Sequence, residues 1–507
     1  MVLREVVDGQ AGLPVPNSTL SYWHKDPSKK LLGYRSTPDL PSEADTIIIG
    51  TGMTGSFAAR FLKEPASPAS QQSLLVLEAR EACWGATGRN GGHCQPFLYG
   101  TDEEVARFEL ETYGFLQDLV AAEDIPCDWR PVNGVHAMLS QDVFGAAARA
   151  IPALRRKVPD FADKIAVVSP EGLVDGPSGE GGGEGDGGGW ARGLTLEKLR
   201  LDRPGVAGAI VQKHAASMWP YKLVCHVLEA LLAAHGPASL NLQTNTPVTA
   251  VARGAARPGR WVVTTPRGRV SAAKVLLATN GYTSRLLPAF SDLIVPVRGQ
   301  IGALLPPEPR AALDYSYVFF GQLKGEGEDG GDTTRDEYLV QRPLPGGELI
   351  LGGGRHLARG MAVGEWRDDT VEPKVARWLR TELEPVLSLD RKEDKAPEEG
   401  LEASMEWTGI MAYSRDQVPW IGAVPESLGG GEGLYIASGF TGHGMPRCAL
   451  AGRGIARIML GDEKGHGIPK TFMVDEDRAA KARENWGRVG TVDEMEALIA
   501  DLRPLME

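Results

Sequence analysis

The chain has 507 residues, of which 42% are hydrophobic and 24% charged, and this predicts a soluble globular protein with more than one domain. Its formal net charge of −12 argues against nucleic acid and anionic membranes as principal partners. The five cysteines are scattered without a CxxC pair, so we expect neither a disulfide framework nor a metal site.

The N-terminal sequence lacks the apolar core of a secretory signal, and no apolar run is long enough to cross a bilayer. Cytoplasm is therefore the expected location, with the peroxisome left open as an alternative. The oligomeric state cannot be derived from composition.

Residues 1–43 show no regular period and are expected to form an extended arm, which Tyr22 and Trp23 anchor to the body of the protein. The Ile-rich run from Ala44 to Gly50 predicts a buried parallel strand, and residues 52–64 have helical spacing. Residues 74–80, which begin with four apolar side chains, predict a second buried strand. Strand, helix and strand within about 35 residues form a βαβ unit.

Farther along the chain, the patterns predict a series of helices, strands and Gly-rich loops. Helices are expected at 102–123, 143–157 and 220–235, and strands at 261–266, 275–280, 300–306 and 348–354. Gly-rich surface loops are expected at 176–189, 325–332 and 429–433. Residues 433–459 predict a strand, a Gly-rich turn and a helix.

The segment Gly50-Thr51-Gly52-Met53-Thr54-Gly55 matches G-x-G-x-x-G within the predicted βαβ unit. Its glycines allow a tight turn, a close approach to a pyrophosphate and close packing of helix on sheet. Glu78, at the end of the second strand, is placed to accept hydrogen bonds from a ribose diol and would repel the 2′-phosphate of NADP. The sequence therefore predicts a dinucleotide at the helix N-terminus.

Two further segments favour FAD over NAD as that dinucleotide. Residues 83–96 are small and Gly-rich, so their backbone can lie against a flat ligand, and Arg89 could meet a phosphate. The turn at 439–445 precedes a predicted helix, whose N-terminus can face an anion. A reduced flavin carries negative charge, which such a site would stabilise.

These motifs resemble the D-amino-acid-oxidase and sarcosine-oxidase superfamily of FAD-dependent oxidoreductases, and the resemblance extends from about Ala44 to Met459. Within that superfamily the chain looks most similar to γ-glutamylputrescine oxidase-like members and their fungal relatives. The segments that carry the resemblance are TIIIGTGMTG, LEAREACWGATGRNGGHCQP, MWPYKL, TNTPV, VLLATNGY, PVRGQ, EWTGIMAYSRDQVPWIG and GFTGHG.

The resemblance implies an α/β fold, α+β overall, in which a Rossmann-type FAD-binding domain is interleaved with a substrate domain on a large mixed or antiparallel sheet. We expect FAD-binding segments at 44–100, 205–295 and 406–465, substrate-domain segments at 101–204 and 296–405, and a tail at 466–507. It also implies a set of residues that would contact a non-covalently bound FAD: Gly50, Gly52, Met53, Thr54, Gly55, Glu78, Ala79, Arg80, Thr87, Gly88, Arg89, Asn90, Gly91, Gly92, His93, Val248, Ala278, Thr279, Asn280, Gly281, Gly439, Phe440, Thr441, Gly442, His443, Gly444 and Met445.

The implied reaction is oxidation of a C–N bond in an amine or amino-acid-like substrate. Hydride passes to flavin N5, the imine hydrolyses to a carbonyl compound, and O2 is reduced to H2O2. The alternatives are an amine dehydrogenase with another electron acceptor, a monooxygenase that needs NAD(P)H, and a flavoprotein without catalysis. The candidate active-site residues are His443, His93, Tyr413, Met411 and Gln300; His443 could instead bind backbone.

Three positions depart from what the resemblance implies. Members that bind amino-acid carboxylates often carry Arg where this chain has Met411, so a simple α-amino acid is disfavoured. Ile350 stands where sarcosine oxidases have an oxygen-activating Lys. Gly409 stands where those enzymes tether flavin through Cys; Cys448 lies beyond the Gly-rich turn, and His93 is an alternative tether.

Overall fold

The computed structural model describes residues 9–177, 189–255, 259–325, 331–390, 399–462, 464–487 and 489. The start of the predicted arm, the centres of the Gly-rich loops at 176–189 and 325–332, and most of the predicted tail beyond residue 487 lie outside the described residues.

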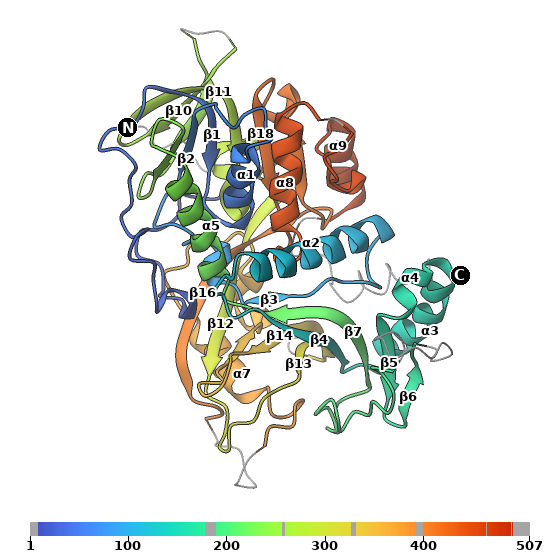
Figure 1. Ribbon diagram of the computed structural model, residues 1–507. Helices are drawn as coiled ribbons and strands as arrows, with labels where there is room; N and C mark the ends of the chain where they lie inside the picture. The colour runs from blue at the N-terminus through green and yellow to red at the C-terminus, as the bar shows by residue number, and fades with distance from the viewer. Residues whose placement is uncertain are drawn as a thin grey trace.

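Two sheets organise the chain, one above the other in Figure 1. The first, here called sheet A, has five neighbouring parallel strands with β17 antiparallel at one edge, and the strands β9 and β10 extend from β11. Its order is β17 (Trp420–Ala423), β18 (Leu434–Ser438), β11 (Gly268–Leu277), β1 (Glu43–Ile49), β2 (Leu74–Leu77) and β8 (Leu240–Gln243); β10 (Trp261–Thr265) pairs with β11, and β9 (Ala250–Arg253) pairs with β10.

The predicted βαβ unit is β1, α1 (Met53–Lys63) and β2. The inner residues of both strands are buried on both faces, as apolar runs in a parallel sheet require. In Figure 1, α1, α5 (Pro220–Ala234) and α8 (Cys448–Met459) lie in front of sheet A, and α1 packs against both of the other helices. Pro220 stands at the first turn of α5, where its missing N–H costs no hydrogen bond.

The second sheet, here called sheet B, is antiparallel except for the parallel pair β4–β13. The sequence prediction of a mixed or antiparallel second sheet is confirmed. Its order is β16 (Ala403–Ser414), β12 (Ile294–Leu304), β15 (Leu349–Gly352), β14 (Thr333–Gln341), β13 (Tyr315–Leu323), β4 (Arg130–Met138), β7 (Gly208–Ser217), β5 (Ile165–Ser169) and β6 (Gly172–Asp175), and β3 (His93–Cys94) pairs with β7.

The remaining helices surround the two sheets. The long helix α2 (Glu103–Ala122) lies between them in Figure 1 and packs against α8, with two acidic residues in its first turn that complement the helix dipole. The others are α3 (Gln141–Lys157), α4 (Pro159–Ala162), α6 (Thr283–Leu286), α7 (Pro373–Thr381) and α9 (Glu476–Asn485).

Sheet membership differs from the predicted domain segments at three strands. The strands β3, β7 and β16 pair within sheet B, although their residues fall in segments expected to bind FAD. Conversely, α2 was expected in the substrate domain, yet its apolar face belongs to the same core as α1 and α5. Apolar periodicity predicts that a strand is buried, but it does not identify the strand with which it pairs.

Replacing Gly55 by Ala tests the close approach of α1 to β1. The added Cβ would lie 2.1 Å from the carbonyl oxygen of Gly50, so the helix must move. We expect the free energy of unfolding, measured with urea, to fall by about 1–3 kcal/mol.

The matched control is Gly114→Ala in α2, where nothing lies within 4 Å of the added methyl group. Because Ala favours helix, this variant should gain about 0.5–1 kcal/mol of unfolding free energy. Equal stabilities of the two variants would contradict the packing described here.

Candidate active site

The turn between β1 and α1 presents backbone N–H groups at the carboxyl end of the parallel strands. Gly50 has a φ of +110°, and an added Cβ would lie 2.5 Å from the carbonyl oxygen of Ala278. Gly52 precedes α1 without a side-chain cap, and Met53 N donates to Thr87 Oγ1 at 3.0 Å. A helix N-terminus bordered mainly by backbone favours a phosphate group.

Glu78 directly follows β2, and its carboxylate is held by three protein donors. One oxygen accepts from Thr51 N at 3.0 Å and from Thr51 Oγ1 at 2.6 Å, and the other accepts from Arg80 N at 3.0 Å. A carboxylate can accept about four hydrogen bonds, so capacity remains for a ribose hydroxyl. The side chain stands on the cavity wall together with Gly52.

A continuous cavity of about 1490 Å³ joins this turn to one face of sheet B. Pockets for drug-sized ligands measure about 300–1,000 Å³, so this cavity has room for a dinucleotide and a substrate beside it. It is lined by most of the predicted cofactor residues: Gly50, Gly52, Met53, Thr54, Glu78, Ala79, Arg80, Thr87, Arg89, Asn90, Gly91, His93, Val248, Ala278, Thr279, Asn280, Gly281, Phe440, Thr441, Gly442, His443, Gly444 and Met445.

Four predicted cofactor residues do not stand on the cavity wall: Gly55, Gly88, Gly92 and Gly439. Three of them pack tightly behind it. A Cβ at Gly55 would meet Gly50 O at 2.1 Å, one at Gly88 would meet Cys83 O at 2.0 Å, and one at Gly92 would meet Met218 O at 2.5 Å. Their small size therefore serves the packing of the wall.

The five predicted active-site residues all line the cavity, on β3, β12, β16 and the 439–445 turn. Gln300 holds the backbone of Glu372: its Nε2 donates to the carbonyl at 3.1 Å, and its Oε1 accepts from the N–H at 2.8 Å. Both ends of this amide are thus used to fix the segment before α7. Tyr413 lies beneath the Arg355 guanidinium, whose carbon is 4.9 Å from the ring centroid.

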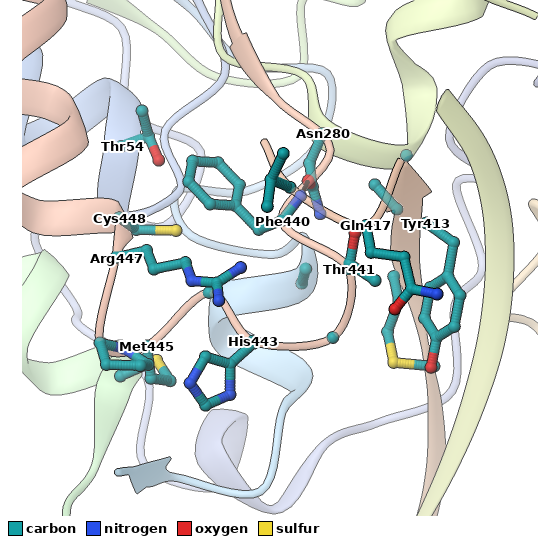
Figure 2. Close-up of a pocket in the computed structure, with 18 of the residues that line it drawn as sticks. Thr54, Asn280, Tyr413, Gln417, Phe440, Thr441, His443, Met445, Arg447 and Cys448 are labelled. Atoms are coloured by element: carbon teal, nitrogen blue, oxygen red, sulfur yellow. Dashed lines mark hydrogen bonds between the residues drawn. The ribbon is translucent and has the colours of Figure 1, made fainter. Parts of the chain in front are cut away.

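His443 is bound to a carboxylate that sequence reasoning did not identify. Its Nε2 donates to Glu109 Oε2 at 3.1 Å, and Arg447 Nε donates to Glu109 Oε1 at 2.6 Å. Phe97 N also donates to Glu109 Oε2, at 2.7 Å. Figure 2 shows the His443 ring and the Arg447 guanidinium side by side, with Tyr413 across the turn.

Glu109 lies on α2, and its side chain is fully buried. Burial pushes the pKa of this carboxyl up, but the charges of His443 and Arg447, together with the hydrogen bonds from His443 and Phe97, outweigh burial and hold the pKa below its ordinary value. The group therefore remains a carboxylate and fixes the side chains of His443 and Arg447 at the cavity wall.

Two imidazoles on the wall, the half-buried His93 and the buried His136, remain neutral. Burial, assisted by the nearby His443, lowers the pKa of His93 to about 3, and its Nε2 is hydrogen-bonded to Ser316 Oγ at 2.9 Å. Burial also lowers the pKa of His136 to about 3. The ring of His136 is held by Tyr99 Oη at 2.6 Å and by Gln95 Nε2 at 2.8 Å.

Arg89 does not reach toward a phosphate, and this expectation is corrected by the structure. Its guanidinium is buried, donates to Thr408 O at 2.7 Å and Thr19 O at 2.6 Å, and lies 3.2 Å from Asp368. An arginine so enclosed by protein acceptors has no donor directed at the cavity. Its backbone still forms part of the wall.

Cys448, which lies beyond the Gly-rich turn, lines the cavity at the start of α8. Burial raises the pKa of this thiol to about 12, so it remains protonated near neutral pH. Ile350, at the position of the oxygen-activating Lys, is buried in the core and does not line the cavity.

The residues that sequence reasoning missed are Glu109, His136, Arg355 and Arg447. A sequence signal existed for the first of them, because Val105, Glu109, Thr112 and Leu116 follow helical spacing, and a carboxylate on that buried stripe demands a charged partner. Arg355 follows three glycines, where a side chain can be directed from a turn. His136 carried no local signal.

Comparison with known families agrees with this geometry. Residues 45–458 match the DAO family, described as FAD dependent oxidoreductase. The chain belongs to this family of FAD-dependent oxidoreductases. A gamma-glutamylputrescine oxidoreductase of Escherichia coli (strain K12) is 22% identical over 446 residues, which cover 82% of this chain and 84% of that protein.

Solved structures share the fold. Glycine oxidase from Geobacillus kaustophilus superposes with a TM-score of 0.62 at 16% identity and covers 86% of this chain and 99% of its own. L-proline dehydrogenase from P. horikoshii gives a TM-score of 0.62 at 17% identity and covers 89% of this chain and 100% of its own. At such identity these likenesses establish the fold alone.

FAD is the cofactor of this family, and the turn at Gly50–Gly52, the carboxylate of Glu78 and the size of the cavity fit it. Among the described residues, His, Cys, Asp and Glu form no cluster of three or more that could hold a metal ion. The helices within the same residues include none that is long and apolar enough to cross a bilayer.

Replacing Glu109 by Gln tests the buried ion network. The neutral amide leaves the Arg447 charge uncompensated, so we expect the free energy of unfolding at pH 7 to fall by about 3–5 kcal/mol. Since the Glu109 pKa is depressed in the folded protein, its stabilising effect is present above the unfolded pKa of about 4.3 and is lost as pH falls further.

The stability difference between wild type and Glu109→Gln should therefore narrow below about pH 4. Urea unfolding at several pH values measures this difference. Glu111→Gln, on the same helix but with a side chain that is 55% exposed, is the control and should change stability by less than about 1 kcal/mol. A constant difference across the whole pH range would refute the assignment.

Proposed function

We propose that this protein is an amine oxidase that converts a C–N bond to an imine, with O2 as the electron acceptor. The imine hydrolyses to a carbonyl compound, and H2O2 is the second product. The observation that carries the proposal is the continuous cavity, which places the dinucleotide turn and the face of sheet B in one space. The E. coli relative is named for an amine substrate, γ-glutamylputrescine, and this supports the same chemistry.

FAD, when bound without a covalent link, supplies the acceptor for hydride from the carbon that carries the amine. The residues of this chain must then favour the neutral amine and orient it. His93 and His136 are uncharged, and Met411 is apolar, so this part of the wall gives no negative charge to stabilise an ammonium ion. A low-polarity wall shifts the bound amine toward its reactive, neutral form.

The cavity wall formed by the 439–445 turn and Arg447 suits a cofactor that gains negative charge when it is reduced. The 439–445 turn carries His443, and Arg447 precedes α8; both are fixed by Glu109. Preorganised hydrogen-bond donors and cationic groups stabilise developing negative charge without reorganisation. We assign these two side chains to the electrostatic stabilisation of the reduced cofactor.

A dehydrogenase with another electron acceptor is the second candidate. It stays open because the resemblance matches the oxygen-activating Lys to Ile350, which carries no ammonium group and packs in the core rather than on the cavity wall. Peroxide production decides between the two candidates.

The proposal predicts that amines reduce the bound flavin. Anaerobic mixing of the holoenzyme with primary, secondary and N-methyl amines should bleach the yellow flavin absorbance, whereas NADPH should not. Under air, an effective amine should yield one H2O2 for each carbonyl product. Bleaching without peroxide would identify a dehydrogenase, and bleaching by NADPH alone would identify a monooxygenase.

Met411 is predicted to select against α-amino acids. The variant Met411→Arg places a guanidinium at the cavity wall, where a bidentate pair with a carboxylate becomes possible. We expect kcat/KM for an α-amino acid, relative to its decarboxylated amine, to rise by about tenfold or more, since a charged hydrogen bond contributes roughly 1.5–3 kcal/mol.

The control variant Met411→Leu keeps the wall apolar and should leave this ratio within about twofold of wild type, as volume-conserving apolar substitutions cost little. An unchanged ratio in Met411→Arg, with flavin content preserved, would show that residue 411 does not face the substrate.

A further inference from the structure

The N-terminal arm lies outside the residues matched by the family, which begin at residue 45, yet part of it is as deeply buried as the core. Trp23 is 0% exposed, Ser21 is 0% exposed and His24 is 3% exposed. In Figure 1 the dark-blue arm follows the flank of sheet A and then turns toward α5 and β16. Its short helix η1 (Tyr22–His24) packs against η2 (Ala86–Arg89), in the Gly-rich segment beside the cavity.

The arm binds this Gly-rich segment through its backbone carbonyls and through Arg89. Ser21 Oγ donates to Gly88 O at 2.7 Å, and the indole N–H of Trp23 donates to Asn90 O. Arg89 Nη2 in turn donates to Thr19 O at 2.6 Å. Successive residues of the segment are thereby fixed from the side opposite the cavity.

The fixed segment acts directly on the dinucleotide turn. Thr87 Oγ1 accepts from the N–H of Met53, the first residue of α1, at 3.0 Å. Thr87 and Asn90 both line the cavity. A displacement of the segment would therefore alter the helix N-terminus that faces the phosphates.

Two glycines of the segment, which the body already requires to be small, also admit the arm. A Cβ on Gly88 would lie 2.5 Å from His24 Nε2, and one on Gly92 would lie 2.8 Å from the Trp23 ring. Part of the glycine content that suggests close approach to a flat ligand therefore serves the approach of the arm.

A second part of the arm reaches the cavity directly. Leu13 and Pro14 line it together with Tyr282 and Arg285. This stretch is anchored to both the side chain and the backbone of Ser284. Ala11 N donates to Ser284 Oγ at 2.9 Å, and Gln10 Nε2 donates to Ser284 O at 3.0 Å. Surface anchoring alone does not require arm residues in the wall of the cavity.

We infer that residues 9–24 of the arm are a functional part of the FAD site. They close one wall of the cavity at Leu13 and Pro14, and they hold the 86–92 segment in the geometry that binds the cofactor. The arm consequently has to be docked against the body for FAD to bind tightly, so FAD affinity and arm docking are coupled. This inference rests on the cofactor and is independent of the proposed substrate.

The first test measures FAD affinity in variants that delete single donors from the arm. Ser21→Ala removes the hydroxyl, and Trp23→Phe removes the indole N–H while it retains an aromatic ring. After removal of the flavin, titration with FAD, followed by the quenching of flavin fluorescence, should give a Kd about 10- to 100-fold weaker in the double variant. The loss should reside mainly in faster FAD release.

The control is Lys30→Ala, because the Lys30 ammonium is exposed and donates to Glu229 O at 3.3 Å, away from the 86–92 segment. This variant should bind FAD as wild type does. Circular dichroism and urea unfolding of the apoproteins establish that the variants fold. A folded double variant with wild-type FAD affinity and release rate would overturn the inference.

The second test uses the unmodified protein. Hydrogen exchange of the backbone amides of residues 9–24 should slow when FAD is added to the apoprotein, since docking and binding stabilise each other. Equal exchange in apoprotein and holoprotein would also overturn the inference. If the arm tests succeed while no amine bleaches the flavin, the proposed function fails and the assignment of the arm stands.

Discussion

The close approach of α1 to β1 is the constraint on which the rest of the site depends. Gly50 turns the chain at a positive φ, and Gly55 allows the helix to lie where a methyl group would meet a carbonyl oxygen at 2.1 Å. Gly452 continues this packing, since its Cβ would lie 2.8 Å from Thr54 O, and so brings α8 close to α1. The first helix N-terminus and the 439–445 turn before α8 therefore share one cavity.

Around this packed centre, buried carboxylates pair with basic side chains that are distant in the sequence. Glu109 joins α2 to residues more than 330 positions later, and Asp368 joins Arg80 and Arg89 beneath the Gly-rich segment. A buried carboxylate is stable as an anion only when its partners are complete. Each network thus fixes the relative position of segments that local structure leaves independent.

The arm, which precedes the residues matched by the family, also fixes distant segments by long-range contacts. Some of its polar contacts are made with the carbonyls of Gly88 and Asn90 and with Ser284, which stand in or beside the cavity wall. The flavin site of this protein is consequently larger than the segment that defines the family.

The sequence alone determined the βαβ unit, because the glycine spacing, the apolar runs and the acid at Glu78 lie within one local stretch of chain. Segments farther along the chain and the family resemblance indicated the class of cofactor and a set of cofactor residues, most of which line the cavity. The bounds of helices such as Pro220–Ala234 could likewise be predicted from the local sequence, because apolar spacing and proline determine them. Tertiary structure decided that β7 and β16 join sheet B, that Arg89 turns away from the cavity and that Glu109 holds His443. Those outcomes depend on which distant groups come into contact when the chain folds. A local sequence pattern predicts that a residue is buried or charged, but it does not identify the strand or side chain with which that residue pairs.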